Sequence, residues 1–188
     1  MQNFRSYLSR YINFGQSWFE RLSFVKADKL KWIYLEQFQA LWDERLQDVV
    51  IVIVPDDLWH KWISPSESHA HENMILFRQG YFESVENPDG IAWMIHELAH
   101  CQKFLDSENK EDYFSEMRNP AFIDLPWSTY PNNAVERYAF GRQFRFLRRL
   151  GKKREEILGL LEPYYSVKDF PFFNKILDEA FENQHLLI

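Results

Sequence analysis

The sequence His96-Glu97-Leu98-Ala99-His100 stands in the middle of a long apolar stretch and constrains the fold more than any other feature. The apolar residues on both sides predict a largely buried helix from Ile91 to Leu105. In a helix, residues four positions apart lie on the same face, so His96 and His100 point the same way. Burying two imidazoles and a carboxylate without partners costs several kcal/mol. The sequence therefore predicts a core helix whose two histidines share a partner.

A metal ion is the partner that this spacing favours. Two imidazoles one helical turn apart can bind a single Zn²⁺ at about 2.0 to 2.1 Å. Glu97 lies one position round the helix, where it can contact a metal-activated water and act as general base. This chemistry predicts hydrolysis of an amide. The alternative is a pair of core histidines satisfied by other side chains. With Cys101 as the single cysteine, neither an internal disulfide nor a site of several thiolates can form, and we assign Cys101 no role.

A catalytic zinc site needs a third protein ligand, and two carboxylates are candidates. Asp106 follows the helix but lacks the preceding glycine that would turn the chain towards the metal. Glu136 lies in a second predicted helix, where the small residue Ala139 allows the two helices to approach, and we favour it. The alternative for Glu136 is a capping role: with Asn133 as N-cap it occupies the N3 position of a capping box.

The rest of the chain predicts one α+β domain, mostly helical, with a small sheet beside the metal-binding helix. Helical periodicity near the N-terminus and from 28 to 47 makes residues 1–48 a helical segment. Residues 49–150 form the predicted core, with a buried strand at Val49–Val54, a more peripheral one at Met74–Arg78 and a helix from Asn132 to Leu150. An irregular loop is predicted for 106–131, and helices at 153–161 and 172–183 are predicted within 151–188.

Charge and hydropathy bear on partners and location. The formal net charge of −6 makes the chain a poor general binder of nucleic acid or anionic membrane. No apolar run approaches the roughly 20 residues that cross a bilayer, and no secretory signal is recognisable, so we expect a cytoplasmic protein without a membrane partner. The basic residues between Arg142 and Arg154 leave open an association with nucleic acid, although a solvated helix end is the simpler interpretation. The oligomeric state stays open.

Several of these residues together resemble the gluzincin group of zinc metallopeptidases. The resemblance spans about residues 72–150 and lies in HELAH and in a later Glu136-x-x-Ala139 behind Tyr130-Pro131. This group includes short intracellular forms, which the chain resembles, and thermolysin is a distant member. Membership would imply a zincin-like metallopeptidase domain over 1–188 that cleaves a peptide or protein substrate with one Zn²⁺ per chain. It would also imply His96, His100 and Glu136 as ligands, Glu97 as catalytic acid/base, and Met74–Arg78 as an edge strand binding extended peptide.

The sequence departs from the thermolysin pattern at one position. Phe140 stands where that pattern has an acid that orients a zinc-binding histidine, so another carboxylate, such as Asp106 or Asp124, or a backbone carbonyl must take this role. The missing acid keeps open a catalytically degenerate regulatory or binding module.

The group that stabilises the oxyanion is also open. Tyr130 is our choice among chemically suitable residues, which also include Tyr138, Arg137, His69 and His71. His69 and His71 could alternatively form a weak second metal site, but a solvated loop is the preferred interpretation.

Overall fold

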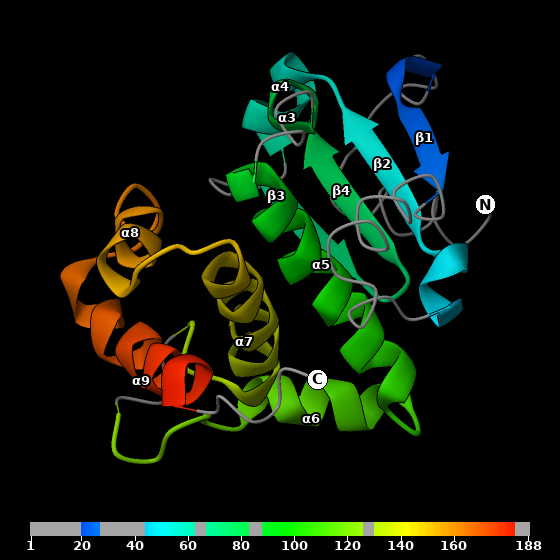
Figure 1. Ribbon diagram of the computed structural model, residues 1–188. Coiled ribbons are helices and arrows are strands. Elements are labelled where there is room, and N and C mark those ends of the chain that lie inside the picture. The colour runs from blue at the N-terminus through cyan, green and yellow to red at the C-terminus, as the bar shows by residue number, and fades with distance from the viewer. Residues whose placement is uncertain (1–19, 27–43, 63–66, 83–87, 126–129, 183–188) are drawn as a thin grey trace.

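The computed structural model describes residues 20–26, 44–62, 67–82, 88–125 and 130–182. Within them the fold is α+β, with several helices around a four-stranded mixed sheet, as predicted (Figure 1). The strands are β1 (Ser23–Lys26), β2 (Val50–Val54), β3 (Ser68–His71) and β4 (Met74–Arg78). The α-helices are α3 (Asp56–Trp62), α4 (Gln79–Phe82), α5 (Pro88–Asp106), α6 (Lys110–Arg118), α7 (Ala134–Arg149), α8 (Arg154–Gly159) and α9 (Phe170–Glu182), and Glu44–Asp48 and Val167–Asp169 form 3₁₀ turns.

The strand order is β1-β2-β4-β3, with β4 parallel to β2 and the outer pairs antiparallel. Both predicted strands are confirmed, but the expectation that Met74–Arg78 is peripheral is wrong. It pairs on both sides, and Met74 to Phe77 are all buried. The edge position beside α5 belongs instead to β3, so the resemblance implied the wrong edge strand.

The sheet is covered on both faces, which explains its continuous apolar strands. Ile51, Ile75 and Phe77 belong to the main core, which α5, α7 and α9 complete. Val52 and Leu76 point to the opposite face and pack against Trp59 of α3, whose side chain is 1% exposed. Alternate residues of one strand therefore enter two different apolar clusters.

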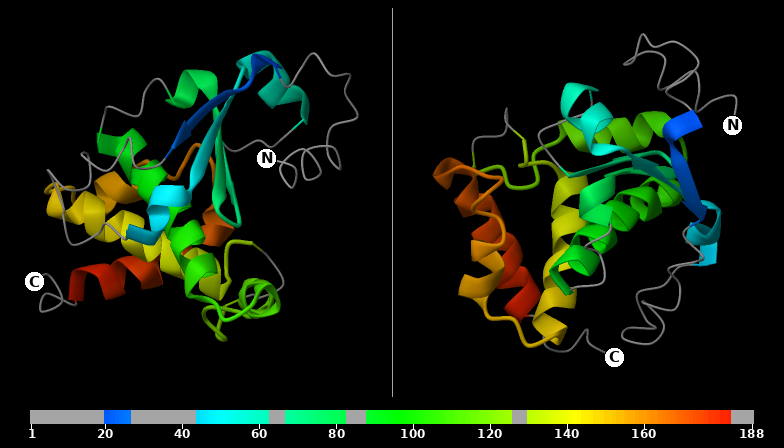
Figure 2. Two further views of the ribbon diagram at one scale, coloured as in Figure 1. Left: turned by 90° about the vertical axis from the view of Figure 1, so that its right-hand side faces the viewer. Right: turned by 90° about the horizontal axis from the view of Figure 1, so that it is seen from above.

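The helices form successive layers beside the sheet. Helix α5 lies against β3 and packs along α7, and α7 packs in turn on α9. Figures 1 and 2 show α5 between the sheet and α7, with α8 and α9 on the outer side of α7. Asn133 caps α7, and Gly151 follows its end with φ +84°, as the predicted stop requires. None of the helices in the described ranges is long and apolar enough to cross a membrane.

Several short elements were not predicted, including the helices α3 and α4 that follow β2 and β4. Strand β1 lies in the segment 1–48, for which only helices were expected. The predicted helix at the N-terminus and most of the one over 28–47 fall outside the described residues, and its end is the 3₁₀ turn Glu44–Asp48. Helix α6 interrupts the supposed irregular loop 106–131, because Asn109 caps it by accepting from the Asp112 backbone N–H at 3.0 Å. Strand β3 replaces the solvated loop expected around His69.

Candidate metal centre

Helix α5 presents its two histidines to α7 from one buried face. His96 is 3% and His100 is 8% exposed, and their ring centroids lie 4.8 Å apart. The two Nε2 atoms face each other at 3.1 Å. The four-residue spacing therefore brings both imidazoles to one point, as predicted.

Glu136 reaches this point from the first turn of α7. Its carboxylate lies 3.4 Å from His96 Nε2 through Oε2 and 3.6 Å from His100 Nε2 through Oε1. The Glu136 backbone N–H donates to Asn133 Oδ1 at 2.9 Å, so the N-cap contact exists. The reciprocal half of a capping box does not, because the side chain faces the histidines and the Asn133 N–H donates to Pro131 O. The backbone N–H of Glu136 therefore contributes to the N-cap of α7, while its carboxylate faces the two histidines.

The start of α7 is itself anchored to the preceding loop. Asn132 is 5% exposed; its side chain accepts from the Phe122 N–H and donates to the Phe122 carbonyl, both at 3.1 Å. This double contact fixes the approach to the helix, and Asn133 then fixes its first turn. The position of the Glu136 carboxylate follows from these two asparagines.

The three side chains together can hold a metal ion. Their ligand atoms all lie within 4.8 Å of one another, and all three residues are buried. The separations of 3.1, 3.4 and 3.6 Å resemble the edge of about 3.3 to 3.4 Å that tetrahedral bonds of about 2.0 to 2.1 Å produce. Among the described residues, Glu136 Oε2 is buried and has no hydrogen-bond partner. A cation bound between this carboxylate and the two imidazole nitrogens would satisfy all three side chains.

Gln143 orients His96. Its side chain is 1% exposed, and its Oε1 lies 3.1 Å from His96 Nδ1. An amide oxygen only accepts, so Nδ1 carries the proton and the Nε2 lone pair of neutral His96 points to the centre. The sequence led us to expect a carboxylate or a backbone carbonyl to accept this His96 proton. The acceptor is instead a side-chain amide seven residues after Glu136, on the same face of α7, while Phe140 packs on the His96 ring at 4.3 Å.

Glu97 lies beside the metal centre and is held by the edge strand. The Ser68 hydroxyl of β3 donates to Glu97 Oε1 at 2.6 Å, and both residues are 6% exposed. This contact occupies one carboxylate oxygen. The sequence alone gives no signal for Ser68, because its contact depends on β3 lying beside α5.

The electrostatic coupling between Glu136 and the histidines is strong. Burial disfavours the charged form of Glu136, but the attraction of His100 and, more weakly, of His96 outweighs it and lowers the pKa of this carboxyl. Burial also disfavours charged His100, yet Glu136 and, more weakly, Glu97 raise the pKa of His100. Glu136 is thus an anion over the whole neutral range.

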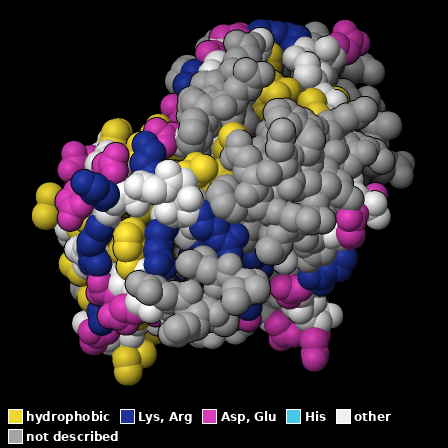
Figure 3. All heavy atoms as spheres, viewed as in Figure 1, with side chains coloured by type: hydrophobic (Ala, Val, Ile, Leu, Met, Phe, Trp, Pro, Cys, Tyr) yellow, Lys and Arg dark blue, Asp and Glu magenta, His cyan; other side chains and the backbone are white. Residues whose placement is uncertain are grey.

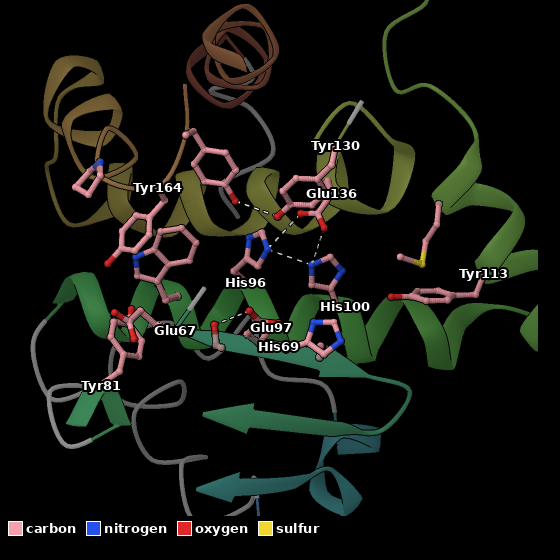
Figure 4. Close-up of a pocket in the computed structure, with 16 residues that line it drawn as sticks. Glu67, His69, Tyr81, His96, Glu97, His100, Tyr113, Tyr130, Glu136 and Tyr164 are labelled. Atoms are coloured by element: carbon pink, nitrogen blue, oxygen red, sulfur yellow. Dashed lines mark hydrogen bonds and ion pairs between the residues drawn. The ribbon is translucent and has the colours of Figure 1, made fainter. Parts of the chain in front are cut away.

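The candidate metal centre opens into a cavity of about 490 Å³. Its lining includes His96, Glu97, His100 and Glu136, so the donor atoms form part of its wall (Figure 4). Residues 68–70 of the edge strand line it from the sheet side, and residues 163–165 line it from the side of α8. A ligand in this cavity would contact the donor set, Glu97 and the β3 backbone together.

Tyr130 also lines the cavity, together with Tyr165, which the sequence analysis missed. Their hydroxyls lie 3.0 Å apart. The Tyr130 side chain is 60% exposed overall, but its hydroxyl end points into the cavity near Glu136 (Figure 4). Desolvation and the Glu136 charge raise the pKa of both phenols, so both stay protonated hydrogen-bond donors.

Other candidates lie outside the centre. Asp106 pairs with Arg45 at 2.7 Å and Asp124 with Lys175 at 2.8 Å, so neither orients a histidine. His69 lines the cavity, whereas His71 lies 3.9 Å from Glu72 and is not part of the lining.

Three further residues are accounted for by other contacts. Arg137 pairs with Glu179, and the Tyr138 hydroxyl donates to Gln102 at 3.0 Å. Cys101 is fully buried in the core, and desolvation raises the pKa of its thiol.

The basic concentration between Arg142 and Arg154 is largely engaged within the chain. Arg148 donates to the Ala180 carbonyl, Lys152 pairs with Asp89 at 3.2 Å, and Arg154 pairs with Asp178. On the face shown in Figure 3, acidic and basic side chains are interspersed over α8 and α9. This arrangement does not favour a nucleic-acid surface.

Comparison of the chain with protein-family models, with curated proteins and with solved structures gives no significant match. The interpretation of the site therefore depends on its own geometry: a buried His₂Glu donor set, a neighbouring carboxylate and an open cavity.

Proposed function

We propose that this protein is a zinc-dependent peptidase that hydrolyses peptide bonds. The observation that carries the proposal is the position of the donor set: His96, His100 and Glu136 converge in the wall of a cavity, with Glu97 beside them. A structural site would be closed by a fourth protein ligand, whereas a catalytic one keeps a position open to solvent or substrate.

The donor chemistry supports zinc. Imidazole and carboxylate suit Zn²⁺, whereas Mg²⁺ and Ca²⁺ prefer oxygen ligands. Bound here, zinc would supply Lewis-acid polarisation of a substrate carbonyl and would acidify water. Glu97 Oε2 takes the proton of the attacking water, because Oε1 already accepts from Ser68. The carboxyl can then deliver this proton to the leaving amine.

Two further parts of the cavity suit a peptide. Strand β3 pairs with β4, and its residues Ser68, His69 and Ala70 line the cavity, so an extended substrate in the cavity would lie along β3 and could bind by β-augmentation. This transfers the expected peptide-binding role from Met74–Arg78 to Ser68–His71. The hydroxyls of Tyr130 and Tyr165 can donate to the developing oxyanion, with Tyr130 as our first candidate.

The test compares zinc content and hydrolysis of an unstructured protein substrate in two variants. Glu97→Gln should retain one zinc and lose about 10² to 10⁴-fold in rate, the usual contribution of a general base. Glu136→Ala should lose both metal and activity. Glu179→Ala, which removes an acid of α9 paired with Arg137, should keep both.

Three results would redirect the proposal. A full equivalent of zinc in Glu136→Ala would place the third ligand elsewhere, and wild-type rates in Glu97→Gln would exclude it as the base. Tight zinc binding without hydrolysis would favour a regulatory or binding module. This alternative is supported by the missing acid at Phe140, since the contact to His96 comes from the neutral amide of Gln143.

A further inference from the structure

One end of the cavity is walled by aromatic rings and a carboxylate. Tyr81, Trp93 and Tyr164 surround this aromatic end together with Glu67, on the opposite side of the metal centre from Tyr113 (Figure 4). The Trp93 ring centroid lies 5.5 Å from that of Tyr164 and 5.7 Å from that of His96. The aromatic end therefore directly adjoins the donor set.

The charges around the aromatic end have a negative surplus. Glu67 accepts from Arg78 Nε, and Arg78 Nη1 contacts Asp56 Oδ2 at 3.1 Å, so one guanidinium is shared by two carboxylates. No lysine or arginine is found among the described residues that line the cavity. The neighbouring pair of Asp89 and Lys152 is balanced. A divalent ion would offset the charges of Glu97 and Glu136. Among the described residues, Glu67, Asp56 and Arg78 then leave one net negative charge next to the aromatic end.

Aromatic faces beside a surplus carboxylate are suited to a cation on an aliphatic stem. The stem can pack on Trp93 and Tyr164 while the charged head lies near Glu67. An acidic side chain would meet repulsion there, and a neutral one would gain only apolar contact.

We propose that the aromatic end binds a lysine or arginine side chain next to the bond to be cleaved. The substrate class is then peptides with a basic residue flanking the scissile bond. This inference rests on the peptidase function proposed above.

The experiment uses the zinc-loaded full chain and peptides with acetylated and amidated ends. The peptides differ only in one residue, either Lys, Arg, Met or Glu, placed in turn on each side of the scissile bond. On one of the two sides, Lys and Arg should exceed Met in kcat/KM by roughly tenfold, within the range of a cation–π contact supported by charge. The Glu peptide should be the poorest.

Variants assign this preference to the aromatic end. Glu67→Gln keeps acceptors for Arg78 and should lower the Lys-to-Met ratio of kcat/KM about tenfold. Tyr164→Ala truncates a ring that is already 44% exposed and should lower the same ratio. Glu111→Gln neutralises an exposed acid on α6 and should leave the ratio unchanged. A wild-type enzyme with no preference for Lys and Arg, or an unchanged ratio in Glu67→Gln, would overturn the inference.

A binding measurement distinguishes failure of this inference from failure of the proposed peptidase function. Calorimetry on the zinc-loaded Glu97→Gln protein measures the affinities of the same peptides without turnover. Tighter binding of the Lys than of the Met peptide, with no cleavage by the wild type, would support the basic subsite and reject the peptidase. Cleavage without selective binding would reject the basic subsite alone.

Discussion

Gln143→Leu tests whether the Gln143 amide orients His96 for the proposed metal binding. The substitution removes the acceptor of the His96 Nδ1 proton and keeps a side chain of similar size in a position that is 1% exposed. In the metal-free protein His96 can respond by moving its proton to Nε2, where His100 and Glu136 provide acceptors. A bound metal forbids this response, because it needs the Nε2 lone pair.

The Gln143→Leu substitution therefore destabilises mainly the metal-bound state of the protein. A buried donor left without a partner costs about 1 to 3 kcal/mol. This corresponds to roughly 5- to 150-fold in affinity, which covers the usual 10- to 100-fold effect of removing such an orienting contact. The free energy of unfolding of the metal-free protein should change by much less.

Zinc affinity measured by competition with a chromophoric chelator checks the first expectation, and denaturant unfolding of the chelator-treated protein checks the second. Gln102→Leu is the matched control, because it removes an amide that accepts from Tyr138 at 3.0 Å on α5, away from the donor set. It should leave zinc affinity unchanged. Equal zinc affinity in Gln143→Leu and wild type would refute the reasoning. It would also be refuted if the substitution lowered the stability of the metal-free protein by as much as that of the metal-bound protein.

Two other predictions concern the base and the donor pair. Ser68→Ala should lower kcat about tenfold at similar KM, because Glu97 loses its 2.6 Å contact, and Ser68→Thr should restore the rate; steady-state kinetics on one peptide decides this. In the metal-free protein the raised pKa of His100 stabilises the fold at pH values below its ordinary pKa of 6.5, and this stabilisation is lost as pH rises through the pKa of the folded state. The lowered pKa of Glu136 stabilises the fold at pH values above its ordinary pKa of 4.5, and this stabilisation is lost as pH falls through the pKa of the folded state. These two contributions predict the largest unfolding free energy between about pH 4.5 and 6.5. Denaturant titrations from pH 4 to 9 with chelator present check it, and a flat profile above pH 6 would contradict it.

The sequence predicted the elements whose pattern is long and regular. The apolar run before Pro55 and the helical periods of α5 and α7 each bury a continuous face, so local pattern and tertiary packing agree. Helix α6 has one buried side chain, Tyr113, and β3 reads Ser-His-Ala-His, so neither carries an apolar period. Their conformation depends on a cap and on pairing with β4, which are not visible in the local sequence.

The same distinction applies to the site. His96 and His100 converge as their four-residue spacing predicted, because helical geometry fixes where they point, and Glu136, favoured because Ala139 lets the helices approach, joins them through the packing of α7 on α5. Gln143 and Ser68 depend on which residues of α7 and β3 meet α5, and this is decided by packing. One signal was available for Gln143: it follows Glu136 by seven residues, two turns along the same helix face.

The capped start of α7 links metal loading to local order in the helix. Glu136 belongs to the first turn of α7, and Asn133 holds this turn through the backbone of the same residue. An ion bound to the Glu136 carboxylate would also hold this end of the helix in place. Metal binding and fraying of the first turn would therefore be thermodynamically coupled. Amide hydrogens in the first turn of α7 would then exchange more slowly as zinc is added, although none of them touches the ion.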